Sequence, residues 1–407
     1  MKIFLSAYAC EPEKGSEPGI GWNVALELAK FHEVHVLTRS NNLPSICEAL
    51  SRYEGAKPTF HGYDLPHWLT FWKKKRRGYH LYYYLWQYGA YLKYRKLANT
   101  CDLVQHLTFA NWAMPSLFMR CKPLCVYGPI GEVHTPAQVM RSLPFKVRMK
   151  ERLRQWGMWL FMHLEPLRVL TPRRADLILE SGHDSVPSGF PQKYASKIRQ
   201  HPQTGINTEE PEYKITRRRK DDVRTHLLIC SEFMHWKGVT YACEVFGRIA
   251  SKRDDVELHI IGKGPEQREM ECILEKHGVT GKVIWHGFVS KREMLQALLD
   301  ADILLYPSYH HGLATVILQA MWAGLPIVAM LDDPVAQAVN EGAGLVAQGD
   351  SMNVILEDLV FKTTKLIDKP DLRQKLGANG RRLIAEKYNW ASLCQTLNGI
   401  LREAVSR

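Results

Sequence analysis

The sequence predicts an α/β protein with two doubly wound parallel-sheet domains, and three observations carry this prediction. Short apolar runs of the length of buried strands recur along the chain. Most of them are followed by a turn residue and then by a helical pattern. A polar, irregular segment, His201–Lys220, separates the series in the first half from the series in the second. Strands that alternate with helices in this way are typical of parallel sheets with helices on both faces.

The first half begins as strand, loop, helix and strand. We expect a strand at Lys2–Ala7, a loop from Cys10 to Gly21, a helix from about Trp22 to Phe31 and a strand at Glu33–Thr38. Two more apolar runs predict the later strands Leu103–His106 and Leu124–Tyr127. This order is the opening of a parallel sheet.

The second half repeats the pattern. Its predicted strands are Leu227–Cys230, Glu257–Ile261, Val283–Trp285, Ile303–Tyr306 and Pro326–Met330. The tail Trp390–Val405 has apolar residues at helical spacing and predicts an amphipathic helix. We therefore expect one domain at residues 1–204, to which a C-terminal helix at 388–407 returns, and a second domain at residues 205–387.

Composition narrows the class of protein. The chain has 407 residues, of which 45% are hydrophobic and 24% charged, as in an ordinary globular protein of two domains. No apolar run approaches the ~20 residues that span a bilayer, and the opening residues predict a first strand rather than a signal peptide. The nine cysteines are scattered without metal-ligand spacing, so we expect reduced thiols in a cytoplasmic protein and no metal site.

The segment from residue 301 to residue 333 predicts a site. Strand Ile303–Tyr306, helix Leu313–Trp322 and strand Leu325–Met330 form a βαβ unit. The loop Ser308–Leu313 lies where the strand ends and the helix begins, and free backbone N–H groups there favour an anion. A buried βαβ unit without a ligand is the alternative.

Several segments in this order resemble the family 4 retaining glycosyltransferases, which have the GT-B fold. They are Gly15–Trp22, Gln105–Phe109, Gly128–Gly131, His235–Gly238, Ile261–Glu266 and Ala320–Pro326. The resemblance implies two Rossmann-like domains that face each other across a cleft. It implies a nucleotide-sugar donor, UDP- or GDP-linked, in the second domain and an acceptor in the first. It also implies retention of configuration, with no metal and no cofactor beyond the donor substrate.

The resemblance also implies the roles of individual residues. Catalytic roles fall to His106, Lys237 and His311. Binding of the donor, or of the acceptor at the first glycine loop, falls to Gly19, Gly21, Lys237, Gly262, Gly264, Gly312, Leu313, Ala314 and Gln319. Lys237 and the backbone at Leu313 and Ala314 would hold the diphosphate, because fixed cations and N–H groups stabilise the charge of the leaving group.

Three positions depart from the family pattern. Glu232 stands where the family has an arginine, and His311 and Gln319 stand where it has two glutamates. A carboxylate near a diphosphate is repulsive by ~1 kcal/mol in water and by more in a cleft. Two hypotheses follow. The protein is an active transferase, or it is a degenerate member that acts as a binding or scaffold partner.

Single residues leave alternatives open. His106 either faces the transferred sugar or is a buried histidine with a hydrogen-bond partner. Glu17 either acts on the acceptor hydroxyl or caps the following helix. The pair His310 and His311 has no third ligand at suitable spacing, so it predicts no metal.

Two basic and aromatic stretches, residues 68–96 and 145–161, contribute to the net charge of +12. Clustered cations with tryptophan and tyrosine suit an anionic membrane surface. A solvated basic face over an aromatic core is the alternative, and nucleic-acid binding is a weaker one, so no nucleic acid is expected. The leading hypothesis is a transferase that acts on a lipid-linked saccharide in surface polysaccharide biosynthesis. It would lie peripherally at the inner face of the cytoplasmic membrane.

Overall fold

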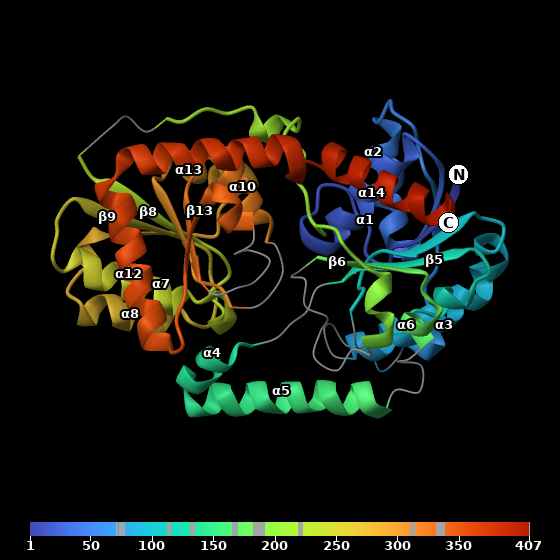
Figure 1. The fold of residues 1–407 in the computed structure, drawn as a ribbon, viewed down its shortest axis with the longest axis horizontal. Coiled ribbons are helices and arrows are strands. Elements are labelled where there is room, and N and C mark those ends of the chain that lie inside the picture. The colour runs from blue at the N-terminus through green and yellow to red at the C-terminus, as the bar shows by residue number, and fades with distance from the viewer. Residues whose placement is uncertain are drawn as a thin grey trace. The chain divides into compact units, whose positions relative to one another are not determined.

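The computed structural model describes residues 1–70, 72, 78–111, 115–130, 135–164, 170–181, 192–218, 223–309, 314–330 and 338–406. The chain forms two compact units (Figure 1). Unit 1 consists of Met1–Glu132, Lys150–Thr204 and Trp390–Arg407, and unit 2 consists of Val133–Met149 and Gly205–Asn389. The domain ranges expected from sequence place residues 133–149 in the first domain. In the structure Val139 and Leu143 pack in the core of unit 2.

The described residues of unit 1 contain a seven-stranded sheet in the order β3-β2-β1-β4-β5-β6-β7. All its neighbouring strands are parallel. The strands are β1 Lys2–Ser6, β2 Glu33–Thr38, β3 Thr59–Gly62, β4 Leu103–His106, β5 Leu124–Ile130, β6 Leu177–Glu180 and β7 Ile198–Gln200. The helices around it are α1 Ser16–Ala29, α2 Leu43–Ser51, α3 Tyr79–Ala98, α6 Leu170–Arg174 and α14 Trp390–Ser406.

The described part of unit 2 contains a six-stranded sheet in the order β10-β9-β8-β11-β12-β13. It is also parallel throughout. Its strands are β8 Thr225–Cys230, β9 Val256–Ile261, β10 Val283–Gly287, β11 Ile303–Tyr306, β12 Ile327–Met330 and β13 Gly344–Ala347. Its helices are α4 Ala137–Ser142, α7 Val239–Ala250, α8 Gln267–Lys276, α9 Lys291–Asp300, α10 Thr315–Ala323, α12 Met352–Asp368 and α13 Pro370–Leu383. Helix α5, Phe145–Leu164, has residues in both units.

Both sheets have the strand order of a doubly wound Rossmann fold, which confirms the predicted fold class. In such sheets the strand order reverses at one point, and the loops that leave the strands there form the usual ligand site. This switch point lies between β1 and β4 in unit 1 and between β8 and β11 in unit 2.

The start of α1 corrects one prediction. We expected a glycine loop as far as Gly21, but the helix begins at Ser16 and contains both Gly19 and Gly21. Pro18 is compatible with this start because the first turn of a helix needs no N–H donor. A Cβ at Gly19 would lie 2.2 Å from the carbonyl oxygen of Lys14, and one at Gly21 would lie 2.3 Å from that of Ala9. The two glycines therefore allow α1 to pack against the backbone of the preceding loop.

The tail helix α14 completes the core of unit 1. Its residues Trp390, Leu393, Cys394, Leu397 and Leu401 are buried in the same cluster as residues of α1. Figure 1 shows α14 beside α1.

Candidate functional site

The switch point of unit 2 joins two loops by direct contacts. One loop follows β8 and contains the short turn His235–Lys237, and the other follows β11. The carbonyl oxygen of Trp236 accepts hydrogen bonds from the backbone N–H of Tyr309 at 3.0 Å and from Oγ of Ser308 at 3.1 Å. Gly238, which ends the turn, has a φ of +65°, and a Cβ there would lie 1.9 Å from the carbonyl oxygen of Pro307. Only glycine fits this contact.

The loop after β9 interlocks with the same segment. The backbone N–H of Phe233 donates to the carbonyl oxygen of Lys263, and the N–H of Glu266 donates to that of Phe233, both at 3.1 Å. Gly262 has a φ of +135°, and its Cβ would lie 1.9 Å from the carbonyl oxygen of Ser231. A Cβ at Gly264 would lie 2.5 Å from that of Phe233. The glycine identity of these two predicted binding residues is thus explained by close backbone packing at the carboxyl end of the sheet.

Lys237 is a partly buried cation of this site. Its Nζ donates a hydrogen bond to Oη of Tyr306 at 3.0 Å, and the ring centroid of Tyr306 is 5.6 Å away. In the part of the chain that the structure describes, no carboxylate pairs with Lys237. The side chain is partly buried, so its positive charge is fixed by a neutral partner and stays available to an anion. Glu232, on the same loop, is exposed.

Helix α10 begins with an open N-terminus. Its N-cap residue Ala314 is extended, no side chain among the described residues caps the first turn, and no acidic residue lies in that turn. Backbone N–H groups in this state favour an anionic ligand. The predicted site residues His311, Gly312 and Leu313 lie outside the described residues.

Gln319 lies on α10 with only 5% of its surface exposed. Its Nε2 donates to Oη of Tyr213 at 3.2 Å. Burial raises the pKa of Tyr213 to about 12, so the phenol is neutral and can accept this bond. The structure thus places Gln319 in packing with the segment before β8, and its predicted contact with a ribose stays a prediction.

His106 ends β4 and is 1% exposed. Its Nε2 is 2.9 Å from Oη of Tyr83, and its Nδ1 is 2.8 Å from Oγ of Ser116. Burial lowers the pKa of His106 to about 3, so the ring is neutral at physiological pH. Both ring nitrogens have protein partners, which is the geometry of a buried histidine with a structural role.

The switch point of unit 1 carries strained backbone. Glu13 and Ser16, which follow β1, and Phe109, which follows β4, all have φ between +56° and +58°. Residues with a side chain rarely adopt this conformation, and such residues cluster at functional sites. Glu17 joins the two loops, since Oε2 accepts from the backbone N–H of Phe109 at 3.1 Å and Oε1 accepts from Nε2 of Gln203 at 3.2 Å. Burial raises the pKa of Glu17.

Three residues of these sites were missed by the sequence reasoning. Tyr306 holds Lys237, Gln203 holds Glu17, and Lys263 is an exposed cation on the loop after β9. The only local signal was a tyrosine at the end of an otherwise aliphatic strand and a lysine between two glycines.

The two basic and aromatic stretches differ in the burial of their large apolar side chains. In residues 68–96, Tyr83 and Trp86 are 1% and 0% exposed and form core, while residues 73–77 lie outside the described residues. Helix α5 instead exposes a stripe of large apolar side chains. No helix in the described part of the chain is long and apolar enough to span a bilayer.

Comparisons with known proteins match part of this chain to a family and the whole chain to a fold. Residues 214–383 match the family model described as glycosyl transferases group 1. The solved structure of WaaG, a glycosyltransferase involved in lipopolysaccharide biosynthesis, covers 98% of this chain and 99% of its own with a TM-score of 0.60 at 19% identity. This likeness establishes the fold across both units.

Two curated relatives match about half of the chain. An MMP alpha-(1->4)-mannosyltransferase of Mycolicibacterium hassiacum is 27% identical over 198 residues, which are 48% of this chain and 47% of the relative. A GDP-mannose-dependent monoacylated alpha-(1-6)-phosphatidylinositol monomannoside mannosyltransferase of Corynebacterium glutamicum is 25% identical over 202 residues, 47% of this chain and 51% of the relative. The chain thus spans about half the length of the curated relatives it matches.

Both units therefore have the GT-B fold. Within this fold, residues 214–383 match the group 1 glycosyl transferases, which confirms the resemblance drawn from the sequence.

Proposed function

We propose that this protein transfers a sugar from a UDP- or GDP-linked donor to a lipid-linked saccharide acceptor, with retention of configuration and without a metal ion or cofactor. The observation that carries the proposal is Lys237, a cation without a described acidic partner at the switch point of the group 1 domain. The named acceptor of the Corynebacterium glutamicum relative, a phosphatidylinositol mannoside, supports a lipid-linked acceptor.

The donor side of the reaction follows from electrostatics. Departure of a nucleoside diphosphate leaves negative charge on the β-phosphate, and Lys237 would stabilise that charge from a fixed position. The uncapped first turn of α10 would add backbone N–H groups. Glu232 opposes binding because it adds negative charge to the same loop. Lys263, exposed on the neighbouring loop, offers positive charge in compensation.

Calorimetric titration tests the donor side. We expect UDP or GDP, and one of their sugar conjugates, to bind the wild type. Lys237→Gln should weaken binding at least tenfold, and Lys252→Gln, on the exposed turn after α7, is the matched control. Glu232→Arg should tighten binding because it replaces a repulsive charge by an attractive one. If none of these nucleotides binds either the wild type or Glu232→Arg, the transferase proposal fails. That result would favour a degenerate family member that acts as a binding or scaffold partner.

We further propose that α5 rests on the cytoplasmic leaflet of an anionic membrane. Its exposed apolar residues are spaced three or four apart and therefore share one side of the helix. They are Phe145, Met149, Leu153, Trp156 and Trp159, with exposed fractions of 41–67%. Basic residues, Lys146, Arg148, Lys150 and Arg152, lie among them. Aromatic rings beside cations suit the interface of an anionic bilayer. The nine cysteines, all free thiols, support a reducing compartment.

Vesicle co-sedimentation tests the membrane contact. The double variant Leu153→Ser/Trp156→Ser should lose most binding to vesicles with anionic lipid. Phe361→Ser, which removes a 64% exposed aromatic from α12, should retain it. Binding should also weaken as salt is raised, since each basic residue near the surface contributes about 1 kcal/mol. Equal binding by the double variant and the control would refute the role of α5.

A further inference from the structure

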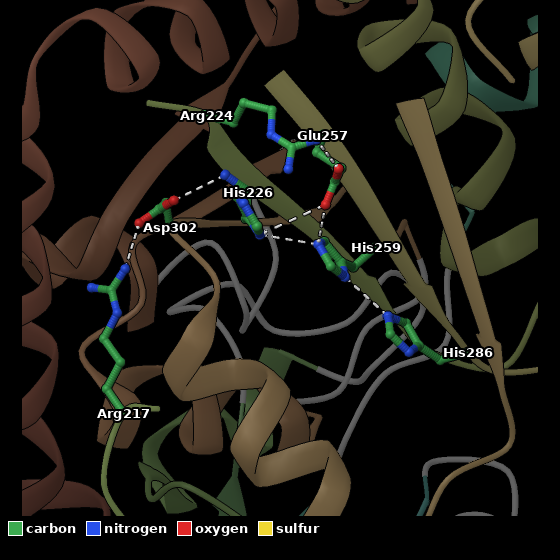
Figure 2. Close-up of polar contacts among 7 residues, drawn as sticks. All are labelled: Arg217, Arg224, His226, Glu257, His259, His286 and Asp302. Atoms are coloured by element: carbon green, nitrogen blue, oxygen red, sulfur yellow. Dashed lines mark hydrogen bonds and ion pairs between the residues drawn. The ribbon is translucent and has the colours of Figure 1, made fainter. Parts of the chain in front are cut away.

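Strands β8, β9 and β10 bring three histidines and a glutamate together on one face of the unit 2 sheet (Figure 2). His226 is the register partner of Glu257 on the neighbouring strand, and His259 lies two residues beyond Glu257 on the same face. Ring nitrogen Nδ1 of His226 is 3.0 Å from Nε2 of His259, and the latter is 3.1 Å from Oε1 of Glu257. Nδ1 of His226 is 4.0 Å from the same Oε1.

These three atoms fit a metal ion better than they fit one another. Nε2 of His259 carries at most one hydrogen, yet it faces both Nδ1 of His226 and Oε1 of Glu257. When only one of these two nitrogens carries a hydrogen, two lone pairs compete for one donor. A tetrahedral zinc ion with bonds of about 2.0–2.1 Å separates its ligand atoms by roughly 3.3 Å. The observed separations of 3.0, 3.1 and 4.0 Å lie around that value.

Surrounding residues contact each of the three proposed ligand residues. Nδ1 of His259 is 2.9 Å from Nε2 of His286, and in the tautomer in which Nδ1 donates to His286 the Nε2 lone pair of His259 faces the cluster. Arg224 binds the other carboxylate oxygen, Oε2, of Glu257. Asp302 accepts a hydrogen bond from the backbone N–H of His226 at 2.9 Å. Partners of this kind fix the orientation of metal ligands.

Unit 1 contains a natural comparison for this cluster. On β2 and β3, Nδ1 of His35 is 3.1 Å from Nε2 of His61, and Nε2 of His35 is 3.0 Å from Oε1 of Glu33. The register partner of Glu33 is Lys2, in the position that His226 occupies opposite Glu257. Nζ of Lys2 lies 3.0 Å from Oε1 of Glu33 and supplies the positive charge there. The cluster in unit 2 has a histidine ligand at this place.

We propose that His226, Glu257 and His259 bind a divalent transition-metal ion, zinc by the preference of this donor set, with water at the fourth position. The ion joins β8 to β9 and stabilises this part of the sheet. It takes no part in sugar transfer, because His226 is at the start of β8 and Lys237 lies beyond its carboxyl end. The site is accessible, since the side chain of His259 is 21% exposed and His286 is exposed.

The test uses the full chain, dialysed against a chelator and then titrated calorimetrically with ZnCl₂. Cys47 and Cys272, the exposed thiols, are replaced by serine throughout so that they do not bind zinc. We expect one zinc ion per chain, and a visible absorption spectrum of tetrahedral type when cobalt replaces zinc. His226→Lys and His259→Gln should weaken the affinity by about 100-fold or more.

Two comparisons keep the result decisive. His226→Lys reproduces the arrangement that unit 1 already has, so its metal-free melting curve should match that of the parent. His35→Gln is the counterpart in unit 1 of His259→Gln and should leave zinc binding unchanged. Zinc should raise the melting temperature of the parent but not of His226→Lys. Absence of saturable binding, or equal affinity in His226→Lys and the parent, would overturn the proposal.

Discussion

The ammonium group of Lys237 is held by the phenol oxygen of Tyr306 at 3.0 Å, so a cation on one loop takes its position from the last residue of β11. Removing that oxygen frees the lysine without changing its charge. We predict that Tyr306→Phe weakens binding of the nucleoside diphosphate by roughly fivefold, the equivalent of about 1 kcal/mol for one hydrogen bond. Calorimetric titration of the wild type and the variant with the nucleoside diphosphate measures this change in affinity. A loss as large as that of Lys237→Gln would mean that Tyr306 itself contacts the ligand.

Two glycines should respond to alanine with opposite sign. Gly238→Ala forces a side chain into a φ of +65° and against the carbonyl oxygen of Pro307, so unfolding free energy should fall by about 2 kcal/mol or more. Gly399 lies exposed in α14 with nothing near its Cβ position, so Gly399→Ala should raise stability by about 0.5–1 kcal/mol. Denaturant titration measures the free energy of unfolding of each variant against that of the wild type. Equal effects of the two changes would contradict the close approach at Gly238.

His106 should make unit 1 acid-sensitive. Its pKa is lowered to about 3 in the folded protein, against about 6.5 when unfolded, so the unfolded chain binds the proton first as pH falls. The contribution of the neutral His106 ring to the free energy of unfolding is fully present above pH 6.5 and is lost toward pH 3. The free energy of unfolding then falls by up to about 1.4 kcal/mol per pH unit. His106→Gln should reduce this slope between pH 6 and pH 4. An unchanged slope in denaturant titrations at several pH values would show that His106 is not the group responsible.

The contribution of Glu17 to stability should depend on pH in the opposite direction, falling as pH rises. Burial raises its pKa in the folded state, so folding favours the protonated form, and this contribution is lost as pH rises through the folded value. Glu17→Gln stays neutral and can still accept from the backbone N–H of Phe109. We predict equal stability of variant and wild type at pH 4 and a more stable variant at pH 8. A variant that is less stable at pH 8 would show that the charge of Glu17 stabilises the loops.

Nine of the thirteen described strands were predicted from the sequence, because buried strands are continuous apolar runs bounded by turns. The four that were missed are β3, β6, β7 and β13. The edge strands β3 and β7 lack such runs, and β6 and β13 have runs of only three apolar residues beside Glu180 or Gly344. The start of α1 was placed too late because Pro18 and two glycines are usually loop residues.

Site residues in a local motif were predicted, whereas those brought together only by the fold were not. Lys237 was found because its motif is local in the sequence. Tyr306 was not, because the two residues are 69 positions apart and meet only where the strands end side by side. The cluster of His226, Glu257 and His259 was missed for a related reason. Ligand spacing was sought along the chain, whereas strand register brings these residues together across the sheet.

The packing of α14 against α1 has a consequence for biosynthesis. A ribosome makes the chain from its N-terminal side, so α1 is made before the segment Gly205–Asn389 of unit 2, and Leu397 and Leu401, which pack in the same cluster as α1, are made after that segment. Unit 1 therefore exposes part of its core while the whole of this segment is being made. Its final folding step waits until α14 has been made, a window in which chaperone binding or aggregation competes with the native state.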